Sequence, residues 1–405
     1  MSLLSKGPIK DFALGIFDGP HATPKESQEG PIFLGIKNVN PDGTLDLSSI
    51  RHIAEEDYLK WIRRVEPQPD DIVFSYEATL HRYAIIPEGF KGCLGRRMAL
   101  IRPDLNMVNP KYLHYYLMSS KWKAIIESNI ISGATVDRIP IKKFPEFELE
   151  LPPLDIQNEI ASILYSYVNL FENNQRRIQL LEESASLLYK EWFINLKFPR
   201  HEHVKIVDGV PEEWEITTYK EVFGFQGGFA FKSKTYQPNG KFGVVTIKNV
   251  HDAKFVTECP SRVDSIPEKM KPHCRLATGD ILLSLTGNVG RVCIVYGENY
   301  LLNQRVAKVI GKKTIPQSYI YWALRSESQQ RFMENLAHGV AQLNLSPVNL
   351  GEAEYIRPTY QLISLFDEVV EPILKQIITL NLQNQQLSSA RDLLLPRLMN
   401  GEIEV

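Results

Sequence analysis

The sequence predicts an α+β protein that contains two globular domains, produced by an internal duplication, and two long helices packed as an antiparallel coiled coil. Three observations lead to this prediction. Short blocks of sequence recur at about half the length of the chain, each globular segment mixes β-like runs with a helical pattern, and a segment with apolar residues at heptad spacing follows each globular segment. A repeat of this length is far too long for a solenoid, so the chain resembles a dimer built into one polypeptide.

The duplication is visible in matching blocks of residues. Ile36-Lys37-Asn38-Val39 returns as Ile247-Lys248-Asn249-Val250, and Asp71-Ile72-Val73-Phe74-Ser75 returns as Asp280-Ile281-Leu282-Leu283-Ser284. The helical segment after Pro152-Pro153 returns after Arg357-Pro358. The repeated unit is therefore about 206 residues long, and two such units fill the 405 residues.

Changes in composition divide the chain into four predicted segments. They are a first globular domain (1–152), a central helical region (153–198), a second globular domain (199–357) and a C-terminal helical region (358–405). The globular segments are rich in Gly, Pro and aromatic residues, and we expect strands at 71–74, 98–101, 279–285 and 292–296. One helix is expected in each domain, over 110–126 and over 316–336.

The two helical regions have a different texture. From Asp155 to about Asn195 the chain contains neither Gly nor Pro, and apolar residues alternate at spacings of four and three. About 40 residues in a helix make a rod of roughly 60 Å. The C-terminal region keeps this register but contains Pro372, so the helix is expected either to start again or to kink there, and to end at Pro396 and Gly401.

Two long apolar stripes in one chain bury each other most simply, and a two-fold relation between the repeats makes the pairing antiparallel. In one register the single amide of each stripe, Asn174 and Asn384, meets the other, which would fix the alignment of the helices. The residues expected to pair the helices are Leu164, Phe171, Asn174, Ile178, Leu181, Leu188, Val370, Ile377, Leu380, Asn384, Leu387 and Leu394.

Composition describes an ordinary soluble globular protein, with 43% hydrophobic and 23% charged residues. No apolar run approaches the ~20 residues that span a bilayer, and residues 1–6 do not resemble a signal peptide, so a cytoplasmic protein without a membrane partner is expected. The four cysteines lie far apart and are expected to be buried free thiols rather than zinc ligands.

No catalytic, cofactor or metal motif is complete. Gly227-Gly228-Phe229-Ala230-Phe231-Lys232-Ser233 lacks the glycine that a phosphate loop needs before its lysine. Asn109-Pro110-Lys111-Tyr112 has lysine where amino-methyltransferases have a second proline, which favours a simple helix start. His201 and His203 offer too few ligands for a metal site. We therefore expect no catalytic residues, no cofactor and no bound metal in this chain.

The repeated strand blocks carry different polar residues at their ends. The second copy continues Thr286-Gly287-Asn288-Val289-Gly290-Arg291, whereas the first continues Tyr76-Glu77-Ala78-Thr79-Leu80-His81-Arg82. Two copies that share their strands but differ in the residues that follow them are typical of two domains that recognise different short patterns. An ordinary β-turn with surface residues explains the same pattern equally well.

The chain resembles the specificity (S) subunits of type I restriction–modification systems over essentially its full length. The most specific matches are 151–161 with 187–193, and the C-terminal stretch 391–403. The resemblance implies that each globular domain is a target-recognition domain for one half of a bipartite, asymmetric site in double-stranded DNA. It implies that the helices set the spacing and dock two modification (methyltransferase) subunits, which methylate adenine, and that restriction (translocase/nuclease) subunits join for cleavage. The methyl donor, Mg and ATP then belong to those partner subunits.

Side chains able to read base edges or contact phosphates occur on the matching strand ends. The candidate DNA-binding residues are Lys37, Asn38, Tyr76, His81, Arg82, Arg96 and Arg97 in the first domain, and Lys248, Asn249, Thr286, Asn288, Arg291, Asn303, Gln304 and Arg305 in the second. The net charge of −2 is not the basic balance of a typical DNA-binding protein. Two alternatives therefore stay open: a structural adaptor with two protein-binding domains on a coiled-coil spacer, and the recognition part of a restriction–methylation enzyme of another type.

Overall fold

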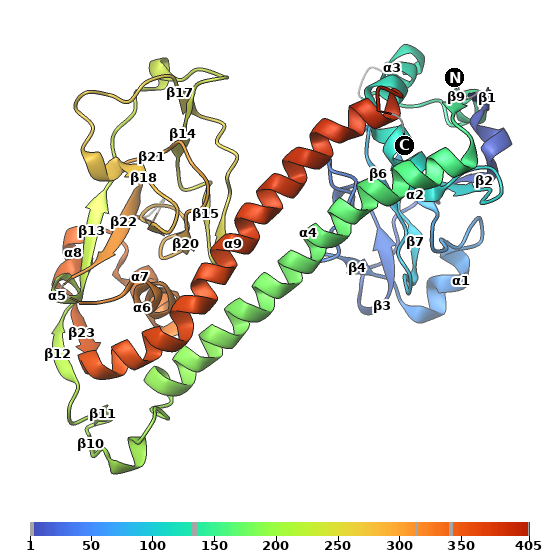
Figure 1. The fold of residues 1–405 in the computed structure, drawn as a ribbon. Helices are drawn as coiled ribbons and strands as arrows, with labels where there is room; N and C mark the ends of the chain where they lie inside the picture. Colours follow the sequence, from blue (N-terminus) through green and yellow to red (C-terminus); the bar gives the residue numbers. More distant parts are fainter. Residues whose placement is uncertain (1–3, 132–135, 313, 340–342, 404) are drawn as a thin grey trace. The chain divides into compact units, whose positions relative to one another are not determined.

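The computed structural model describes residues 4–131, 136–312, 314–339, 343–403 and 405. The chain forms two compact units, one of Met1–Leu170 with Leu387–Val405 and one of Phe171–Gln386, called unit 1 and unit 2 below. Both long helices, α4 (Leu154–Tyr189) and α9 (Tyr360–Met399), cross the boundary between the units (Figure 1). Each unit therefore holds one globular domain and a part of each helix.

Unit 1 is built on two small sheets. The first has the order β2-β8-β5-β6 and is antiparallel, and the second has the order β4-β3-β7, with β3 and β7 parallel. The strands are β2 (Ala13–Asp18), β3 (Ser27–Leu34), β4 (Arg51–His52), β5 (Ile72–Ser75), β6 (Tyr83–Ile85), β7 (Gly92–Leu94) and β8 (Met98–Pro103). A separate ribbon pairs β1 (Ser5–Pro8) with β9 (Glu148–Leu151). The helices are α1 (Tyr58–Trp61), α2 (Pro110–Met118) and α3 (Ser120–Asn129).

Unit 2 repeats this topology. Its sheets have the orders β13-β22-β19-β20 and β17-β14-β21-β18, with β14 and β21 parallel, and a ribbon pairs β12 with β23. The strands are β12 (Glu215–Thr218), β13 (Phe223–Gly227), β14 (Phe242–Val245), β17 (Arg262–Val263), β18 (Arg275–Leu276), β19 (Ile281–Ser284), β20 (Val292–Ile294), β21 (Tyr300–Leu302), β22 (Val306–Gly311) and β23 (Glu354–Arg357). Two short hairpins pair β10 (Ile206–Val207) with β11 (Val210–Pro211), and β15 (Val250–His251) with β16 (Lys254–Phe255). The helices are α5 (Tyr219–Val222), α6 (Gln317–Arg325), α7 (Glu327–Leu336) and α8 (Pro347–Glu352).

The single helix expected in each domain is two helices in the structure. Ser119 ends α2 in an extended conformation (φ −70°, ψ 157°), and its Oγ accepts a hydrogen bond from the N–H of Trp122 at the start of α3. Ser326 is extended in the same way between α6 and α7 (φ −58°, ψ 142°). Serine is a preferred N-cap residue, so the break at Ser119 has a local cause that the apolar periodicity concealed, whereas the side chain of Ser326 does not cap α7.

The repeated aspartate stabilises the same structure in both copies. Asp71 accepts from the backbone N–H of Gln68 and forms a 2.8 Å ion pair with Arg102 on the neighbouring strand β8. Asp280 accepts from the backbone N–H of Ala277 and forms a 2.7 Å ion pair with Lys308 on β22. This block therefore recurs because it holds the frame of the domain.

Within unit 2, α4 and α9 run antiparallel. Asn174 donates from Nδ2 to Oδ1 of Asn384 at 3.1 Å, and further along α4 the ring of Tyr189 lies 5.8 Å from that of Phe366. The amide contact is the one that the predicted register places together. The predicted stripe residues of unit 2 that belong to its apolar core or pack against it are Ile178, Leu181, Leu188, Val370 and Ile377, and Leu380 is also buried. In unit 1 Leu164 is a core residue and Leu394 packs against the same core.

The ends of the long helices differ from the prediction. α9 continues through Pro372 and through Pro396 and ends at Met399, so the expected stop at Pro396 is wrong. Gly401, with φ +69°, lies just beyond the end, where glycine readily adopts a left-handed conformation. α4 is followed by a π-helical segment, Lys190–Ile194. Among the described residues no helix combines the length and the apolarity that crossing a membrane requires.

Candidate nucleic-acid interface

Three segments meet at one end of each domain. In unit 1 the N–H of Tyr76, after β5, donates to the carbonyl of Arg97, before β8, at 3.1 Å. In unit 2 the N–H of Leu285 donates to the carbonyl of Arg305 at 3.0 Å, in the equivalent place. The third segment of each domain follows β3 or β14. In unit 1 the N–H of Gly95 donates to the carbonyl of Leu34, and in unit 2 the N–H of Asn303 donates to the carbonyl of Val245. The predicted strand-end residues are therefore grouped by the fold.

The first domain presents both free and committed side chains at this end. Lys37 and Arg96 are exposed and Arg82 is half-buried, and none of the three has a carboxylate partner among the described residues. Arg97 has φ +72° and its Nε lies 2.9 Å from Oε1 of Glu77. Unpaired cationic groups beside a held guanidinium suit an anionic partner.

Two further candidates of the first domain are constrained by burial. Tyr76 is 5% exposed, its hydroxyl lies 3.4 Å from Nδ1 of His21, and burial raises the pKa of that hydroxyl. His81 has φ +60° and lies 4.0 Å from Glu127 of α3, and burial lowers the pKa of its imidazole. The imidazole of His81 therefore lies beside α3 and stays partly exposed.

The second domain holds a different group of side chains. Arg291 Nη1 lies 3.2 Å from Nδ1 of His251, and the amide oxygen of Asn288, when it faces Arg291, accepts from Nη1 and Nη2 at 3.1 and 3.0 Å. Thr286 donates to Oδ1 of Asn344 at 3.0 Å. The remaining candidates are the half-buried Asn303, whose Oδ1 accepts from the N–H of Arg305, and the exposed Lys248, Gln304 and Arg305.

Asn38 and Asn249 are committed to the fold. Asn38 is 2% exposed, accepts from the N–H of Gly35 and donates to the carbonyls of Asp46 and Ser49. Asn249 is 1% exposed and likewise accepts from the N–H of Thr246 and donates to the carbonyls of Val256 and Glu258. A buried amide with its donors and acceptor occupied has nothing left for a base, so we remove both residues from the candidate DNA contacts.

A segment that the sequence motifs did not assign also reaches this end. The residues after β13 lie across the β21–β22 turn, because the N–H of Phe229 donates to Leu302 and that of Gln304 donates to Phe229. A Cβ added to Gly228 would lie 2.2 Å from the carbonyl oxygen of Asn303, so the chain approaches closely only with glycine. The exposed Lys232 follows on this segment. The two consecutive glycines, Gly227 and Gly228, were the available signal in the sequence.

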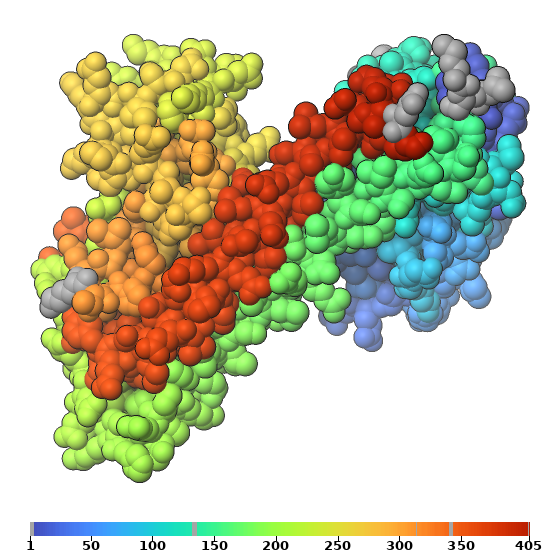
Figure 2. Space-filling view, viewed as in Figure 1, coloured from blue at the N-terminus to red at the C-terminus, as the bar shows by residue number. Residues whose placement is uncertain are grey.

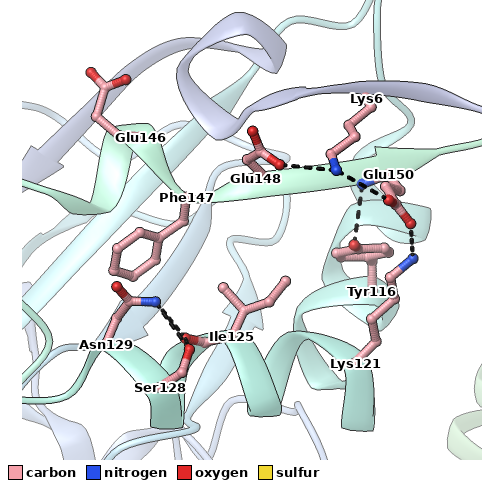
Figure 3. Close-up of a pocket in the computed structure, with 10 residues that line it drawn as sticks. All are labelled: Lys6, Tyr116, Lys121, Ile125, Ser128, Asn129, Glu146, Phe147, Glu148 and Glu150. Atoms are coloured by element: carbon pink, nitrogen blue, oxygen red, sulfur yellow. Dashed lines mark hydrogen bonds and ion pairs between the residues drawn. The ribbon is translucent and has the colours of Figure 1, made fainter.

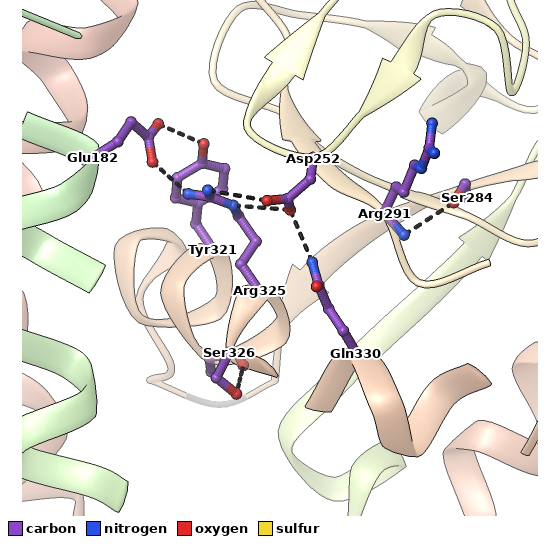
Figure 4. A network of polar contacts seen from close by, with 9 residues as sticks. Glu182, Asp252, Ser284, Arg291, Tyr321, Arg325, Ser326 and Gln330 are labelled. Carbon is purple, nitrogen blue, oxygen red and sulfur yellow. Dashed lines mark hydrogen bonds and ion pairs between the residues drawn. The ribbon is translucent and has the colours of Figure 1, made fainter. Parts of the chain in front are cut away.

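A buried ionic network lies beside the second group (Figure 4). Glu182 of α4 accepts from the hydroxyl of Tyr321 at 2.7 Å and pairs with the guanidinium of Arg325 at the end of α6. Arg325 Nε donates to Asp252 in the β15–β16 turn at 3.2 Å, and Gln330 of α7 donates to the same carboxylate at 2.9 Å. Burial raises the pKa of the Glu182 carboxyl, and Arg325 lowers it in part.

Unit 1 also contains a cavity of about 400 Å³ near the β1–β9 ribbon (Figure 3). Its charged groups satisfy one another, because Lys6 lies 3.2 Å from Glu148 and 3.7 Å from Glu150, which also pairs with Lys121. Among the described residues there is no cluster of three or more histidine, cysteine or acidic residues that could hold a metal ion. The four cysteines are free and buried.

Comparisons with known proteins identify the family. The family model described as the type I restriction modification DNA specificity domain matches residues 29–183 and 211–354. The chain is 23% identical over 377 residues to the HindI specificity subunit of Haemophilus influenzae, covering 76% of this chain and 80% of that one. It is 26% identical over 325 residues to the MjaVIII specificity subunit of Methanocaldococcus jannaschii, covering 78% and 76%.

A solved structure shares the fold. The type I restriction–modification S subunit from M. genitalium aligns with a TM-score of 0.58 at 17% identity, covering 98% of this chain and 96% of that one. Its similarity agrees with the two matched segments: the first covers most of the first domain and α4 as far as residue 183, and the second covers the second domain and ends before α9. The chain therefore belongs to the type I restriction modification DNA specificity family and carries the family's domain twice.

Proposed function

We propose that this protein is the sequence-specific DNA-recognition subunit of a type I restriction–modification complex, and that each domain reads one half of a bipartite, asymmetric site. One observation carries the proposal: the two domains share a topology and the same backbone contacts at one end, but carry different side chains there. Tyr76 and Arg97 of the first domain correspond in these contacts to Leu285 and Arg305 of the second. Two such surfaces would read two different half-sites.

The chemistry of the side chains suits double-stranded DNA. Arginine pairs with the edge of guanine through two donors, and lysine contacts phosphates without regard to sequence. Arg96, Arg291 and Arg305 are the proposed base readers or phosphate contacts of the two domains. The further proposed contacts are Lys37, Tyr76, His81, Arg82, Arg97, Lys248, Thr286, Asn288, Asn303 and Gln304.

The long helices provide the proposed spacer. Their stripes would pack as an antiparallel coiled coil, and the helix length would fix the separation of the half-sites. Leu180 and Leu187 lie seven residues apart on α4 and are 55% and 60% exposed, which leaves apolar surface for a partner. On α9, Val369 is 46% exposed, and the outer side of the helix is open in the view of Figure 2. We propose that two modification subunits dock on these helices and that restriction subunits join them.

Catalysis is assigned to the partners. The chain itself is proposed to be non-catalytic and cytoplasmic, with the methyl donor, Mg and ATP bound by the modification and restriction subunits. The cavity of unit 1 is lined by lysines and glutamates that pair with one another.

Binding selection from a random double-stranded DNA library tests the proposal. We expect one enriched bipartite site with two different halves at a fixed spacing, and an affinity that falls steeply with salt. Uniform binding of all sequences, or no binding with or without methyltransferase subunits, would contradict DNA recognition. Because the net charge is −2, the alternative function is a protein-binding adaptor, and the absence of any DNA binding would favour that alternative.

A further inference from the structure

The ionic network of unit 2 joins three elements that are distant in the sequence. Arg325, the last residue of α6, contacts Glu182 of α4 on one side and Asp252 of the β15–β16 turn on the other. The side chains of Glu182 and Arg325 are only 10% and 12% exposed. Gln330 of α7 supplies a further donor to Asp252 (Figure 4). The turn is therefore tied to the long helix through charged groups.

The residue that precedes Asp252, at the end of β15, contacts a candidate DNA-binding residue. His251 lies directly before Asp252, and its Nε2 is 3.1 Å from the carbonyl of Lys248. Because a carbonyl only accepts, Nε2 carries the proton, and Nδ1 is left to accept from Nη1 of Arg291 at 3.2 Å. The N–H of Arg291 also donates to Oγ of Ser284. The guanidinium is thus held by this imidazole, whose position depends on the turn, and by the amide oxygen of Asn288 when it faces Arg291.

Among the described residues, the first domain packs its equivalent turn on α2 without an ion pair, although the charge of Asp42 in that turn partly opposes the lowering of the His114 pKa. A Cβ added to Gly43 would lie 2.4 Å from Sδ of Met118 and 2.7 Å from Cε1 of His114, so this turn rests on α2 through those side chains. Met118 ends α2 as Arg325 ends α6. Since one copy of the domain builds the contact from a methionine, the frame does not require the ionic network of the other.

A buried ion pair is seldom retained for stability, because the cost of desolvation offsets most of its attraction. In some proteins its directional bonds instead fix one arrangement of the elements that carry it. We infer that Glu182, Arg325 and Asp252 are positioning residues for the second half-site, which hold His251 and thereby aim the guanidinium of Arg291 at one base pair. This inference rests on the proposed DNA recognition and adds residues to it that contact no DNA themselves.

Two variants of the full chain test it, one at a partly exposed side chain and one at the buried ion pair. Asp252→Asn removes the charge from a side chain that is 46% exposed, and the double variant Glu182→Gln/Arg325→Met installs the methionine of the first domain. The control is Lys220→Ala, which removes the exposed ion pair with Glu352 in the same unit. Each protein is measured against the selected site and against every single-base substitution in both half-sites.

In the wild-type protein, one base pair of the second half-site should depend on Arg291 and discriminate by about tenfold or more. We expect both positioning variants to lose most of that discrimination, with the first half-site profile and the melting temperature close to wild type. Lys220→Ala should retain both profiles. Partial loss in Asp252→Asn and full loss in Arg291→Ala at the same base pair would support the assignment.

Other outcomes overturn it. Unchanged discrimination in Asp252→Asn refutes the inference even if the double variant does not fold, and so does an equal loss in both half-sites, which indicates a general structural effect. If wild-type protein selects no sequence at all, the proposed function itself fails. These results are distinguishable because the first domain serves as an internal reference in every measurement.

Discussion

The side-chain amides of Asn174 on α4 and Asn384 on α9 are hydrogen-bonded to each other at 3.1 Å and are only 1% and 6% exposed. A polar pair in an otherwise apolar stripe aligns the two helices, because any shift leaves both amides buried without a partner. The contact therefore sets the register of the helices within unit 2.

The first prediction concerns this pair. Asn174→Leu should lower the free energy of unfolding by about 1–3 kcal/mol, since Asn384 loses its buried partner. The double variant Asn174→Leu/Asn384→Leu should recover that loss, because two apolar residues satisfy each other. Denaturant unfolding of the three proteins measures both effects. A single variant as stable as the wild type would show that the amide bond does not set the alignment.

The repeated aspartate gives a second prediction. Asp71→Ala should destabilise the protein by about 2–4 kcal/mol, because Arg102 loses its carboxylate partner and keeps only the carbonyl of Glu66, and the N–H of Gln68 loses its acceptor. Asp71→Asn keeps one acceptor oxygen and should cost less. Asp280→Ala should behave similarly in unit 2, where Lys308 loses its partner. Thermal unfolding measures the order of these variants, and equal stability of Asp71→Ala and wild type would contradict the role in the frame.

His114 predicts how stability depends on pH. Burial lowers its pKa to about 4, so the unfolded chain, with a histidine pKa near 6.5, binds the proton more strongly than the folded one. Stability should therefore fall as the pH falls from about 6.5 to 4, by about 3 kcal/mol in total from this group. Comparing the wild type with His114→Gln by denaturant unfolding at several pH values isolates the effect. The same slope in both proteins would refute it.

Exposed arginines give a fourth prediction. Arg96→Ala should weaken binding through the first half-site, and Arg305→Ala through the second, because both are exposed at the proposed interfaces. A lost phosphate contact reduces the slope of log affinity against log salt by about 1, whereas a lost base contact relaxes the preference at one position. Lys10→Ala, which breaks an exposed ion pair with Glu146, is the control. Arginine variants indistinguishable from this control would argue against the interface.

Two adjacent glycines provide a matched pair for the fifth prediction. Gly228→Ala should weaken binding to the second half-site, because its Cβ would lie 2.2 Å from the carbonyl oxygen of Asn303 and push the β21–β22 turn away. Gly227→Ala meets no atom within 4 Å and should bind like the wild type. Affinity for the selected site, measured beside the melting temperature, separates local displacement from unfolding. Equal binding by both variants would place the turn outside the interface.

The sequence predicted the features that depend on periodicity. The stripe through Ile178 and Leu181 and the strand after Asp71 lie where the alternation of apolar residues places them. It predicted less well what depends on local hydrogen bonds. Ser119 divides a helix by capping the next one, and neither its neighbours nor the apolar spacing indicated this. The reason is that one capping bond is a small, local term beside the burial of an apolar face.

The candidate DNA-contact residues were harder to predict, because a residue can recur in both copies of the domain for two different reasons. Asn38 and Asn249 recur in both copies, and a polar residue at a strand end suits DNA, but their amides bind the backbone of their own loops. A repeated residue in a duplicated domain more often holds the shared frame, whereas residues that differ carry the difference in recognition. Asp252 and Arg325 could not be found from spacing, since the fold alone brings them together.

The strand pairs β1–β9 and β12–β23, which join the two ends of each domain, have a consequence for how recognition specificity changes. The chain enters unit 1's domain on β1 and leaves on β9, with Ser5 paired to Leu151, and it enters and leaves the other on β12 and β23, with Glu215 paired to Arg357. Entry and exit lie on neighbouring strands, so a domain behaves as a cassette with adjacent ends. Recombination at those ends would exchange one half of the target sequence and keep the other, giving a new host specificity in a single genetic event.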